Sequence, residues 1–303
     1  MYPGSGEIMP EATAHSRIAS LPLWQGKLHV SALKGGISNE SYLVEDATGR
    51  YVVRFGQDYP FHHVSRHREA MITQAAHRAG FAPRLCHSGD GVMVSEYLGA
   101  KTWEATDVRA NIERVASLIR DFHHTMPEHI EGPGFMFWVF HTIRDYSRTL
   151  IAGKSRLADQ LPEFLRVAAE LEAAQKPLPI VFGHNDLLPA NILEDARRLW
   201  LIDFEYAGFS TAMFDLAGLA SNAGFDDAES EVLLSAYFQA PPDPELRRAH
   251  AAMQCASLLR EVMWSLVSEL YLNAPGVDYA AYTDQNLDRY HAALARFRMN
   301  YTS

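Results

Sequence analysis

The stretch from residue 181 to residue 208, VFGHNDLLPANILEDARRLWLIDFEYAG, limits most strictly how this chain can fold. Short apolar pieces with the composition of strands alternate there with the polar residues His184, Asp186, Asn191 and Asp203. Apolar runs of this kind favour buried strands, whereas carboxylates are rarely buried without a partner. The segment therefore predicts short core strands whose polar ends face a common cleft.

The spacing of these polar residues indicates a particular chemistry. His184-x-Asp186-x-x-x-x-Asn191, followed by Asp203 at the end of an apolar strand, is the arrangement that phosphoryl transfer from ATP uses in kinase-like folds. Asp186 would meet the acceptor hydroxyl, while Asn191 and Asp203 would offer oxygen atoms to Mg²⁺. The alternative is a polar loop between two core strands, whose aspartates only form turns. The nearby Asp203-Phe204-Glu205 unit favours catalysis, and we interpret His184 as a structural hydrogen-bonding residue.

Upstream of this segment the pattern is that of an antiparallel sheet with one inserted helix. The alternating runs LHVSAL, SYLVE, RYVVRF, APRLCHS and GVMVSEYL predict strands between about residue 25 and residue 97. SRHREAMITQAAHRAG predicts a helix between the third and fourth runs, with Gly80 at its end. The first ~15 residues are rich in Gly, Pro, Ser and Glu, and we expect them to be loose.

After Tyr97 the periodicity becomes helical. DVRANIERVASLIRDFHH predicts one continuous helix, and further helices are expected near residues 156–176, 227–239 and 245–272. At 303 residues the chain is longer than most single cores. We therefore predict an α+β fold of two lobes: a small antiparallel β N-lobe with one helix in residues 1–97, and a larger, mainly helical C-lobe in residues 98–303.

In these motifs the sequence resembles the choline/ethanolamine kinases, within the aminoglycoside-phosphotransferase-like branch of the protein-kinase-like fold. The resemblance rests on His184-Asn185-Asp186, Asn191-Ile192-Leu193 and Ile202-Asp203-Phe204-Glu205-Tyr206, and it extends from about Leu33 to Phe297. It implies a protein-kinase-like two-lobed fold and an enzyme that uses ATP and Mg²⁺. Asp186, Asn191 and Arg54 are then the predicted catalytic residues, and Asn191, Asp203 and Glu205 the predicted metal ligands.

The resemblance also implies a nucleotide site. Lys34-Gly35-Gly36-Ile37-Ser38-Asn39 joins the first two predicted strands and is similar to the family's phosphate-side loop. Gly36 would let backbone N–H groups approach the phosphates, and Ser38 and Asn39 would add polar contacts. Taken alone, this loop is better explained as a plain β-turn, and only its position between the first two strands favours the phosphate-side role. At the predicted lobe junction, Glu96-Tyr97-Leu98, the resemblance implies main-chain hydrogen bonds from Glu96 and Leu98 to adenine.

Arg54 stands in the third predicted strand, where choline kinases carry an arginine and other kinases of this fold carry a lysine. Its planar guanidinium can reach a phosphate and a carboxylate together, and Glu69 on the inserted helix is the expected partner. The alternative is an exposed arginine with an unrelated glutamate on the helix.

A cationic acceptor requires a pocket with a carboxylate and aromatic walls. The residues that we predict for this pocket are Asp186, Leu188, Tyr206, Asn222, Glu261 and Trp264. The sequence departs from the family here, because Asn222 stands where a glutamate is usual and Glu261 where a tryptophan is usual. Glu261 and Trp264 lie three residues apart and so share one helix face. Core packing for Trp264 and a solvated helix face for Glu261 are the open alternatives.

Composition excludes some classes of partner. The chain has 27 Lys and Arg against 37 Asp and Glu, a net charge of −10, which argues against binding nucleic acid. No apolar run reaches the ~18 residues of a membrane span, and the N-terminus lacks the pattern of a secretory signal. We therefore expect a cytoplasmic protein. The sequence does not indicate its oligomeric state or the number of Mg²⁺ ions that it uses.

Together these features predict an ATP-dependent kinase that phosphorylates the hydroxyl of a small amino alcohol, with choline or ethanolamine as the first candidates. One alternative is a kinase of the same fold that acts on an aminoglycoside, thiamine or another small hydroxyl compound. Another is a nucleotide-binding homologue without catalysis, which would require a missing base or metal ligand. The sequence lacks neither.

Overall fold

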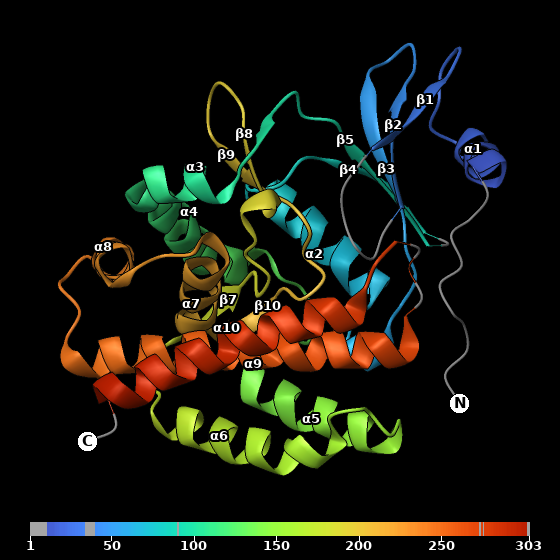
Figure 1. Cartoon of the computed structure of the whole chain (residues 1–303). Helices are drawn as coiled ribbons and strands as arrows, with labels where there is room; N and C mark the ends of the chain where they lie inside the picture. The colour runs from blue at the N-terminus through green and yellow to red at the C-terminus, as the bar shows by residue number, and fades with distance from the viewer. Residues whose placement is uncertain (1–10, 34–39, 90, 273, 275, 302–303) are drawn as a thin grey trace.

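The structure is a computed structural model, and it describes residues 11–33, 40–89, 91–272, 274 and 276–301 (Figure 1). The predicted phosphate-side residues Gly36, Ser38 and Asn39 lie outside this range. An antiparallel five-stranded sheet of order β1-β2-β3-β5-β4 forms one end of the molecule. Its strands are β1 (His29–Leu33), β2 (Glu40–Glu45), β3 (Arg50–Phe55), β4 (Leu85–Gly89) and β5 (Val92–Glu96). The alternating runs in the sequence predicted these strands, and the structure confirms them.

Alternation along the strands decides what each face of the sheet does, because successive side chains point to opposite faces. Val44, Val53 and Val94 are fully buried on one face, where they form an apolar cluster. Their neighbours in sequence, including Arg54 and Met93, line a cavity on the other face. The same strands thus supply a core on one side and a functional surface on the other.

Helix α1 (Glu11–Ala19) packs against the buried face of the sheet (Figure 1). The prediction that about the first 15 residues are loose is therefore wrong for residues 11–15. Ala14 and Ile18 lie four residues apart on one side of the helix, and both are fully buried in the sheet's apolar cluster. The helix was not predicted because the N-terminal stretch is rich in Gly, Pro, Ser and Glu and its apolar pair is short.

Helix α2 (Arg66–Arg78) is the predicted inserted helix, and the chain leaves it through Gly80 at φ +85°. A left-handed backbone of this kind favours glycine. Its buried residues Ile72 and Ala76 do not join the core of the sheet. They pack with Phe122 and other residues beyond position 97 in a second core. Since this core crosses residue 97, the division of the chain into lobes at that position stays a prediction.

The rest of the chain is mainly helical, as predicted. Its helices are α3 (Ala105–Ala110), α4 (Ile112–Thr125), α5 (Val139–Ala152), α6 (Leu161–Ala173), α7 (Ala212–Ala223), α8 (Asp227–Phe238), α9 (Pro244–Tyr271) and α10 (Tyr279–Tyr301), with the 3₁₀ helices η1 (Pro60–His62), η2 (Met126–His129), η3 (Ala158–Gln160) and η4 (Pro189–Asn191). The predicted single helix in residues 107–124 is wrong, because the chain breaks at Asn111, with φ −137° and ψ 38°. The Asn111 amide donates to the Asp107 carbonyl, a local bond that competes with helix continuation.

Short strands carry the polar motif of residues 181–208. β7 (Ile180–Gly183) pairs with β10 (Gly208–Thr211), and β8 (Ile192–Glu194) pairs with β6 (Lys101–Thr102) and β9 (Leu199–Leu201). The polar residues lie in the turns between these strands. The prediction of short core strands with polar ends is thus confirmed.

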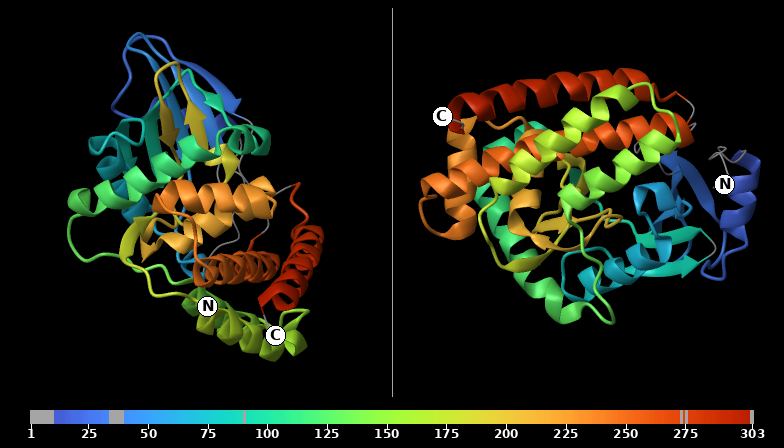
Figure 2. Two further views of the ribbon diagram at one scale, coloured as in Figure 1. Left: turned by 90° about the vertical axis from the view of Figure 1, so that its left-hand side faces the viewer. Right: turned by 90° about the horizontal axis from the view of Figure 1, so that it is seen from below.

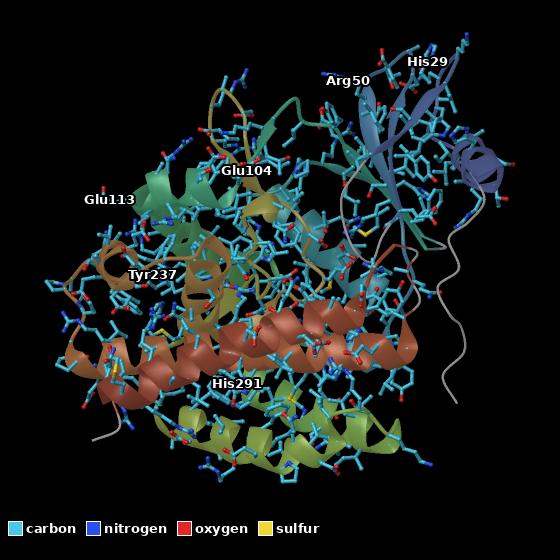
Figure 3. All side chains as sticks on the ribbon, in the orientation of Figure 1. His29, Arg50, Glu104, Glu113, Tyr237 and His291 are labelled. Carbon is cyan, nitrogen blue, oxygen red and sulfur yellow. The ribbon has the colours of Figure 1, made fainter. Side chains whose placement is uncertain are left out.

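Helices α9 and α10 lie side by side, and both views in Figure 2 show them next to α5 and α6. The 28-residue α9 is the longest helix described, and much of its length is buried. Figure 3 shows His29 and Arg50 at the end of the sheet farthest from this helical layer. Among the described residues, no helix combines the length and apolar composition needed to cross a membrane.

We expect Leu266→Ala to lower the free energy of unfolding by about 2 to 5 kcal/mol, because Leu266 is fully buried in the core that surrounds α9. Val232→Ala on α8 is the control, since Val232 is 41% exposed. Urea unfolding followed by circular dichroism measures both variants. Equal stability losses in the two would contradict the assignment of α9 to the core.

Candidate active site

A cavity of about 710 Å³ lies between the open face of the sheet and the helical layer. Every predicted site residue that the structure describes lines it: Arg54, Glu69, Glu96, Leu98, Asp186, Leu188, Asn191, Asp203, Glu205, Tyr206, Asn222, Glu261 and Trp264. The fold therefore brings together residues that are up to about two hundred positions apart in the chain. Their individual roles stay predictions.

Asp215 on α7 holds the segment that carries Asp186. Its carboxylate accepts hydrogen bonds from the backbone N–H groups of His184 and Asn185, both at 2.7 Å. Strand β7 must end in glycine here, because a Cβ on Gly183 would lie 2.7 Å from the Asn185 amide oxygen. Asp215 therefore braces the loop that carries Asp186.

Asn185 has a left-handed backbone at φ 60°, a conformation that asparagine tolerates better than most residues. Its side-chain amide donates to the carbonyl oxygens of Tyr206 and Gly208, at 3.1 and 3.2 Å. The bonds tie the Asp186 loop to the chain just after the Asp203 segment. The two polar motifs of the sequence are thus joined by Asn185.

Buried histidines complete this support. Burial alone would raise the pKa of Asp215, but the hydrogen bond from His123 and the bonds from the His184 segment hold it below the ordinary value. His184 is fully buried and donates through Nε2 to the Ile202 carbonyl at 3.0 Å. Burial lowers the pKa of His184, so its ring is neutral at pH 7. His184 therefore has the structural position that we predicted.

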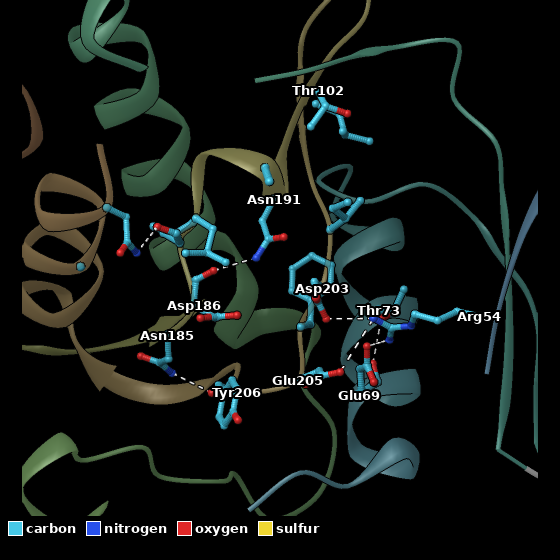
Figure 4. A pocket seen from close by; sticks show the side chains of 18 of the residues that line it. Arg54, Glu69, Thr73, Thr102, Asn185, Asp186, Asn191, Asp203, Glu205 and Tyr206 are labelled. Atoms are coloured by element: carbon cyan, nitrogen blue, oxygen red, sulfur yellow. Dashed lines mark hydrogen bonds and ion pairs between the residues drawn. The ribbon is translucent and has the colours of Figure 1, made fainter. Parts of the chain in front are cut away.

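Asp203, Glu205 and Glu69 form a carboxylate cluster in which one oxygen of each lies within 4.8 Å of the others (Figure 4). Arg54 donates to Asp203 at 2.9 Å and forms an ion pair with Glu69. The predicted pairing of Arg54 and Glu69 is therefore present. Arg54 lies on the cavity wall with a largely buried side chain, so the alternative of an exposed arginine is wrong.

Arg66 also joins this cluster, at the start of α2. Its Nη1 contacts Glu69 at 2.7 Å and Glu205 at 2.5 Å. Glu69 is 1% exposed and Glu205 is 6% exposed, and carboxylates buried to this extent require paired cations. The network joins β3, α2 and the segment that follows Asp203.

The oxygen donors present fit a divalent cation. The amide nitrogen of the Asn191 side chain donates a hydrogen bond to the Asp186 carbonyl at 2.9 Å (Figure 4). The amide oxygen is thus left for another partner. The Asp203 carboxylate lies in the same cavity, at a residue with φ 69°. Mg²⁺ prefers such carboxylate and carbonyl oxygens. Glu205 is paired with Arg66 and Asp203 with Arg54, so the part of each carboxylate in binding a cation stays a prediction.

The Asp186 carboxyl lines the same cavity. Burial raises its pKa well above the ordinary value, and the nearby carboxylates of Asp203 and Glu261 add to this, whereas Arg260 opposes it. A carboxyl with a raised pKa is a better proton acceptor when it is ionised. Asp186 therefore has the electrostatic setting of a general base.

Aromatic and acidic residues form the wall of the cavity on the side of α9. The Trp264 indole donates to the Tyr206 hydroxyl at 3.0 Å, and the His62 ring stacks on it with centroids 4.9 Å apart. Glu261 accepts a hydrogen bond from the Tyr282 hydroxyl at 2.7 Å. Glu261 is thus part of the cavity wall, and the alternative of a solvated helix face is wrong.

Asn222, at the position where the family usually has a glutamate, makes a structural hydrogen bond. Its amide nitrogen donates to the Leu187 carbonyl at 3.1 Å, so it supports the loop that carries Asp186. Leu188 lies next to this loop and is 40% exposed. Asn222 contributes no charge to the pocket.

Several residues of the site were missed at the level of sequence: Arg66, Asn185, His62, Arg260 and Tyr282. Arg66 had a signal, because it precedes Glu69 by three residues and such pairs meet on a helix. Arg260 also had a signal, because it is a charged residue within a long, mostly apolar helix. His62 and Tyr282 had none, since only packing brings them to Trp264 and Glu261.

The comparisons with known proteins agree with this geometry. The profile of a family described as "Phosphotransferase enzyme family" matches residues 29–251. The chain is 24% identical to Protein LicA of Haemophilus influenzae, over 84% of this chain and 76% of that protein. It is 26% identical to probable choline kinase 3 of Arabidopsis thaliana, over 87% of this chain and 86% of that protein.

Among solved structures, a choline/ethanolamine kinase family protein from Mesorhizobium loti superposes with a TM-score of 0.75 at 26% identity. The match covers 95% of this chain and 99% of that chain. These similarities confirm the resemblance found in the motifs and the predicted kinase-like fold.

We expect Asp215→Asn to lower the free energy of unfolding at pH 7 by about 3 kcal/mol, because a neutral amide cannot accept all the bonds that the buried carboxylate accepts. The pKa of Asp215 is depressed in the folded protein, so its stabilisation is complete at neutral pH and is lost as the pH falls through the folded pKa. The variant should therefore lose less stability on acidification than the parent protein.

Urea unfolding at pH 7 and at lower pH values measures both effects. Asp159→Asn is the control, since Asp159 is exposed. An Asp215→Asn protein with parental stability at every pH would contradict the bracing role.

Proposed function

The chain belongs to the phosphotransferase enzyme family, and we propose that it transfers the γ-phosphoryl group of ATP to the hydroxyl of a small amino alcohol. It is a phosphotransferase with an alcohol group as acceptor. Choline and ethanolamine are the first acceptors to consider, because the similar proteins include a probable choline kinase. The observation that carries the proposal is a single cavity lined by Asp186, Asn191, Asp203 and Arg54.

In this proposal Asp186 orients the acceptor hydroxyl and accepts its proton. Asp215 and Asn185 hold the loop, so the carboxyl meets the hydroxyl with little loss of conformational entropy. The cavity shields the group from bulk water, and this burial raises its pKa. Proximity and proton acceptance are then the main contributions of this loop.

Arg54 acts at the phosphate side. The Glu69 carboxylate forms an ion pair with its guanidinium and holds it in place. Arg66 also pairs with Glu69 and so balances the charge of this buried carboxylate. The planar group can then donate to phosphate oxygens and stabilise the charge that develops during transfer. Asn191 and Asp203 would hold Mg²⁺, which neutralises phosphate charge when it is bound.

The acceptor side supports an amino alcohol. Glu261 supplies a carboxylate to this part of the cavity, and Trp264 and Tyr206 supply aromatic rings. Carboxylates and aromatic faces both attract ammonium groups. The substrate thus lies with its hydroxyl at Asp186 and its ammonium toward α9.

The decisive experiment is an acceptor panel of choline, ethanolamine, thiamine and an aminoglycoside, with Mg-ATP and detection of the phosphorylated product. We expect transfer to amino alcohols, and we expect Asp186→Ala to lower kcat by about 1,000-fold while nucleotide binding persists. Asp121→Ala, at an exposed carboxylate on α4, is the control. ATP binding without transfer to any acceptor would favour a non-catalytic homologue, and a near-normal rate in Asp186→Ala would remove that residue from the mechanism.

We expect Asp203→Asn to raise the Mg²⁺ concentration for half-maximal rate by at least about tenfold, because it replaces a charged oxygen ligand with a neutral one. Titration of Mg²⁺ at saturating ATP measures the change. Asp288→Asn, at an exposed aspartate of α10, should leave the titration unchanged. Identical curves for Asp203→Asn and the parent enzyme would show that Asp203 is not a ligand.

A further inference from the structure

A guanidinium group lies in the wall of the acceptor part of the cavity. Arg260 on α9 lines the cavity next to Glu261, one helical turn before Trp264, and it is 5% exposed. Arginine is almost never buried to this degree without paired carboxylates. A site built for a purely cationic acceptor has no need of a buried cation. The contacts of Arg260 indicate what this cation is for.

The protein satisfies Arg260 only in part. Its Nη1 donates to Glu261 at 3.0 Å, and its guanidinium lies over the Tyr206 ring, 4.5 Å from the centroid. Nε and Nη2 are enclosed, and neither has a hydrogen-bond partner among the described residues. These two nitrogens form one edge of the planar group, whose N–H bonds are spaced to meet both oxygens of a carboxylate.

The other buried arginines of the site differ in this respect. Arg54 is paired with Asp203 and Glu69, and Arg66 with Glu69 and Glu205. Among the described residues Arg260 forms an ion pair with Glu261 alone, and Glu261 also accepts a bond from Tyr282. An unpaired N–H edge in a protein interior is destabilising, so a ligand group that accepts hydrogen bonds from it would be favoured.

Charge balance leads to the same conclusion. On the acceptor side the carboxylates of Asp186 and Glu261 face the guanidinium of Arg260, and Arg289 adds a second, exposed guanidinium to the lining. Asn222 adds no charge. A ligand that brings only an ammonium group would place a further positive charge beside Arg260, whereas a zwitterion would not.

We propose that the acceptor carries a carboxylate besides its ammonium and hydroxyl groups, and that Arg260 binds this carboxylate. The substrate class is then that of hydroxy amino acids, and the inference rests on the proposed phosphotransfer to an amino alcohol. Glu261 and Trp264 face the ammonium group, and Asp186 faces the hydroxyl. To reach the carboxylate, Arg260 turns its enclosed edge toward the cavity, a motion that breaks the bond from Nη1 to Glu261 and shifts the guanidinium over the Tyr206 ring. Choline and ethanolamine, which have no carboxylate, are the poorer acceptors.

Pairs of acceptors that differ by one carboxylate test this directly: ethanolamine against L-serine, 3-amino-1-propanol against L-homoserine, and choline against N,N,N-trimethyl-L-serine. For at least one pair we expect kcat/KM of the carboxylate-bearing member to exceed that of its partner by at least about tenfold. Equilibrium binding of the same pairs, in the presence of a non-hydrolysable ATP analogue, should show the same order.

Two variants assign the preference to Arg260. Arg260→Met keeps the length of the side chain and removes its charge, and it should lower kcat/KM for the preferred carboxylate-bearing acceptor by about 100-fold while the matched amino alcohol loses little. Arg260→Lys keeps the charge without the paired donors and should lie between these values. Arg248→Met is the matched control, because Arg248 is an exposed arginine of the same helix that does not line the cavity. Thermal unfolding confirms that each variant is folded.

The outcomes separate this inference from the proposed function. If every simple amino alcohol is used at least as well as its carboxylate-bearing partner, or if both Arg260 variants weaken the two members of each pair equally, the inference is wrong and the proposed function stands. If no member of any pair receives a phosphoryl group, the proposed function itself is wrong.

Discussion

The buried carboxylate of Asp215 is the constraint on which the geometry of the site depends. It accepts hydrogen bonds from two backbone N–H groups just after β7 and one from His123, and its side chain is buried. A charge in such a place stabilises the fold only while every one of these donors is present. The loop that follows β7 therefore has one favourable arrangement, in which Asp186 faces the cavity. Asn185 joins the same loop to the chain beyond Asp203, so hydrogen bonds connect the two motifs directly.

A second network connects this unit to the sheet. Arg54 comes from β3, Glu69 and Arg66 from α2, and Asp203 and Glu205 from the segment after β9. Each cation contacts at least two carboxylates, which compensates charges that burial would otherwise penalise. The phosphate side of the cavity is thereby held between parts of the chain that the strand pattern alone does not connect. Its order comes from electrostatics as much as from apolar packing.

The acceptor side is built differently, because one long helix supplies most of its chemistry. Arg260, Glu261 and Trp264 all come from α9, and His62 reaches Trp264 from the connection between β3 and α2. Each phosphate-side guanidinium group pairs with at least two carboxylates, whereas Arg260 on the acceptor side pairs with one and has an edge without a partner among the described residues. The two halves of one cavity thus differ in how completely the protein satisfies its own charges. That difference is the basis of the proposed selection of the acceptor by Arg260.

The sequence by itself determined the strands of the sheet, the helix α2, the order of the polar motifs and the identity of Asp186, Asn191, Asp203 and Arg54 as candidates. The strands, the helix and the polar motifs follow from period-two alternation, helical periodicity and short spacings, which are local properties, whereas Arg54 was identified through the family resemblance. It concealed α1, whose buried pair is short, and the break at Asn111, which depends on one side-chain bond. Only the tertiary structure decided that Asn222 supports a loop, that Glu261 faces the cavity, and that Arg260 is buried with one edge unpaired. The physical reason is that the charge state and hydrogen bonding of a side chain depend on what packs against it, and the partners here come from segments far apart in the chain.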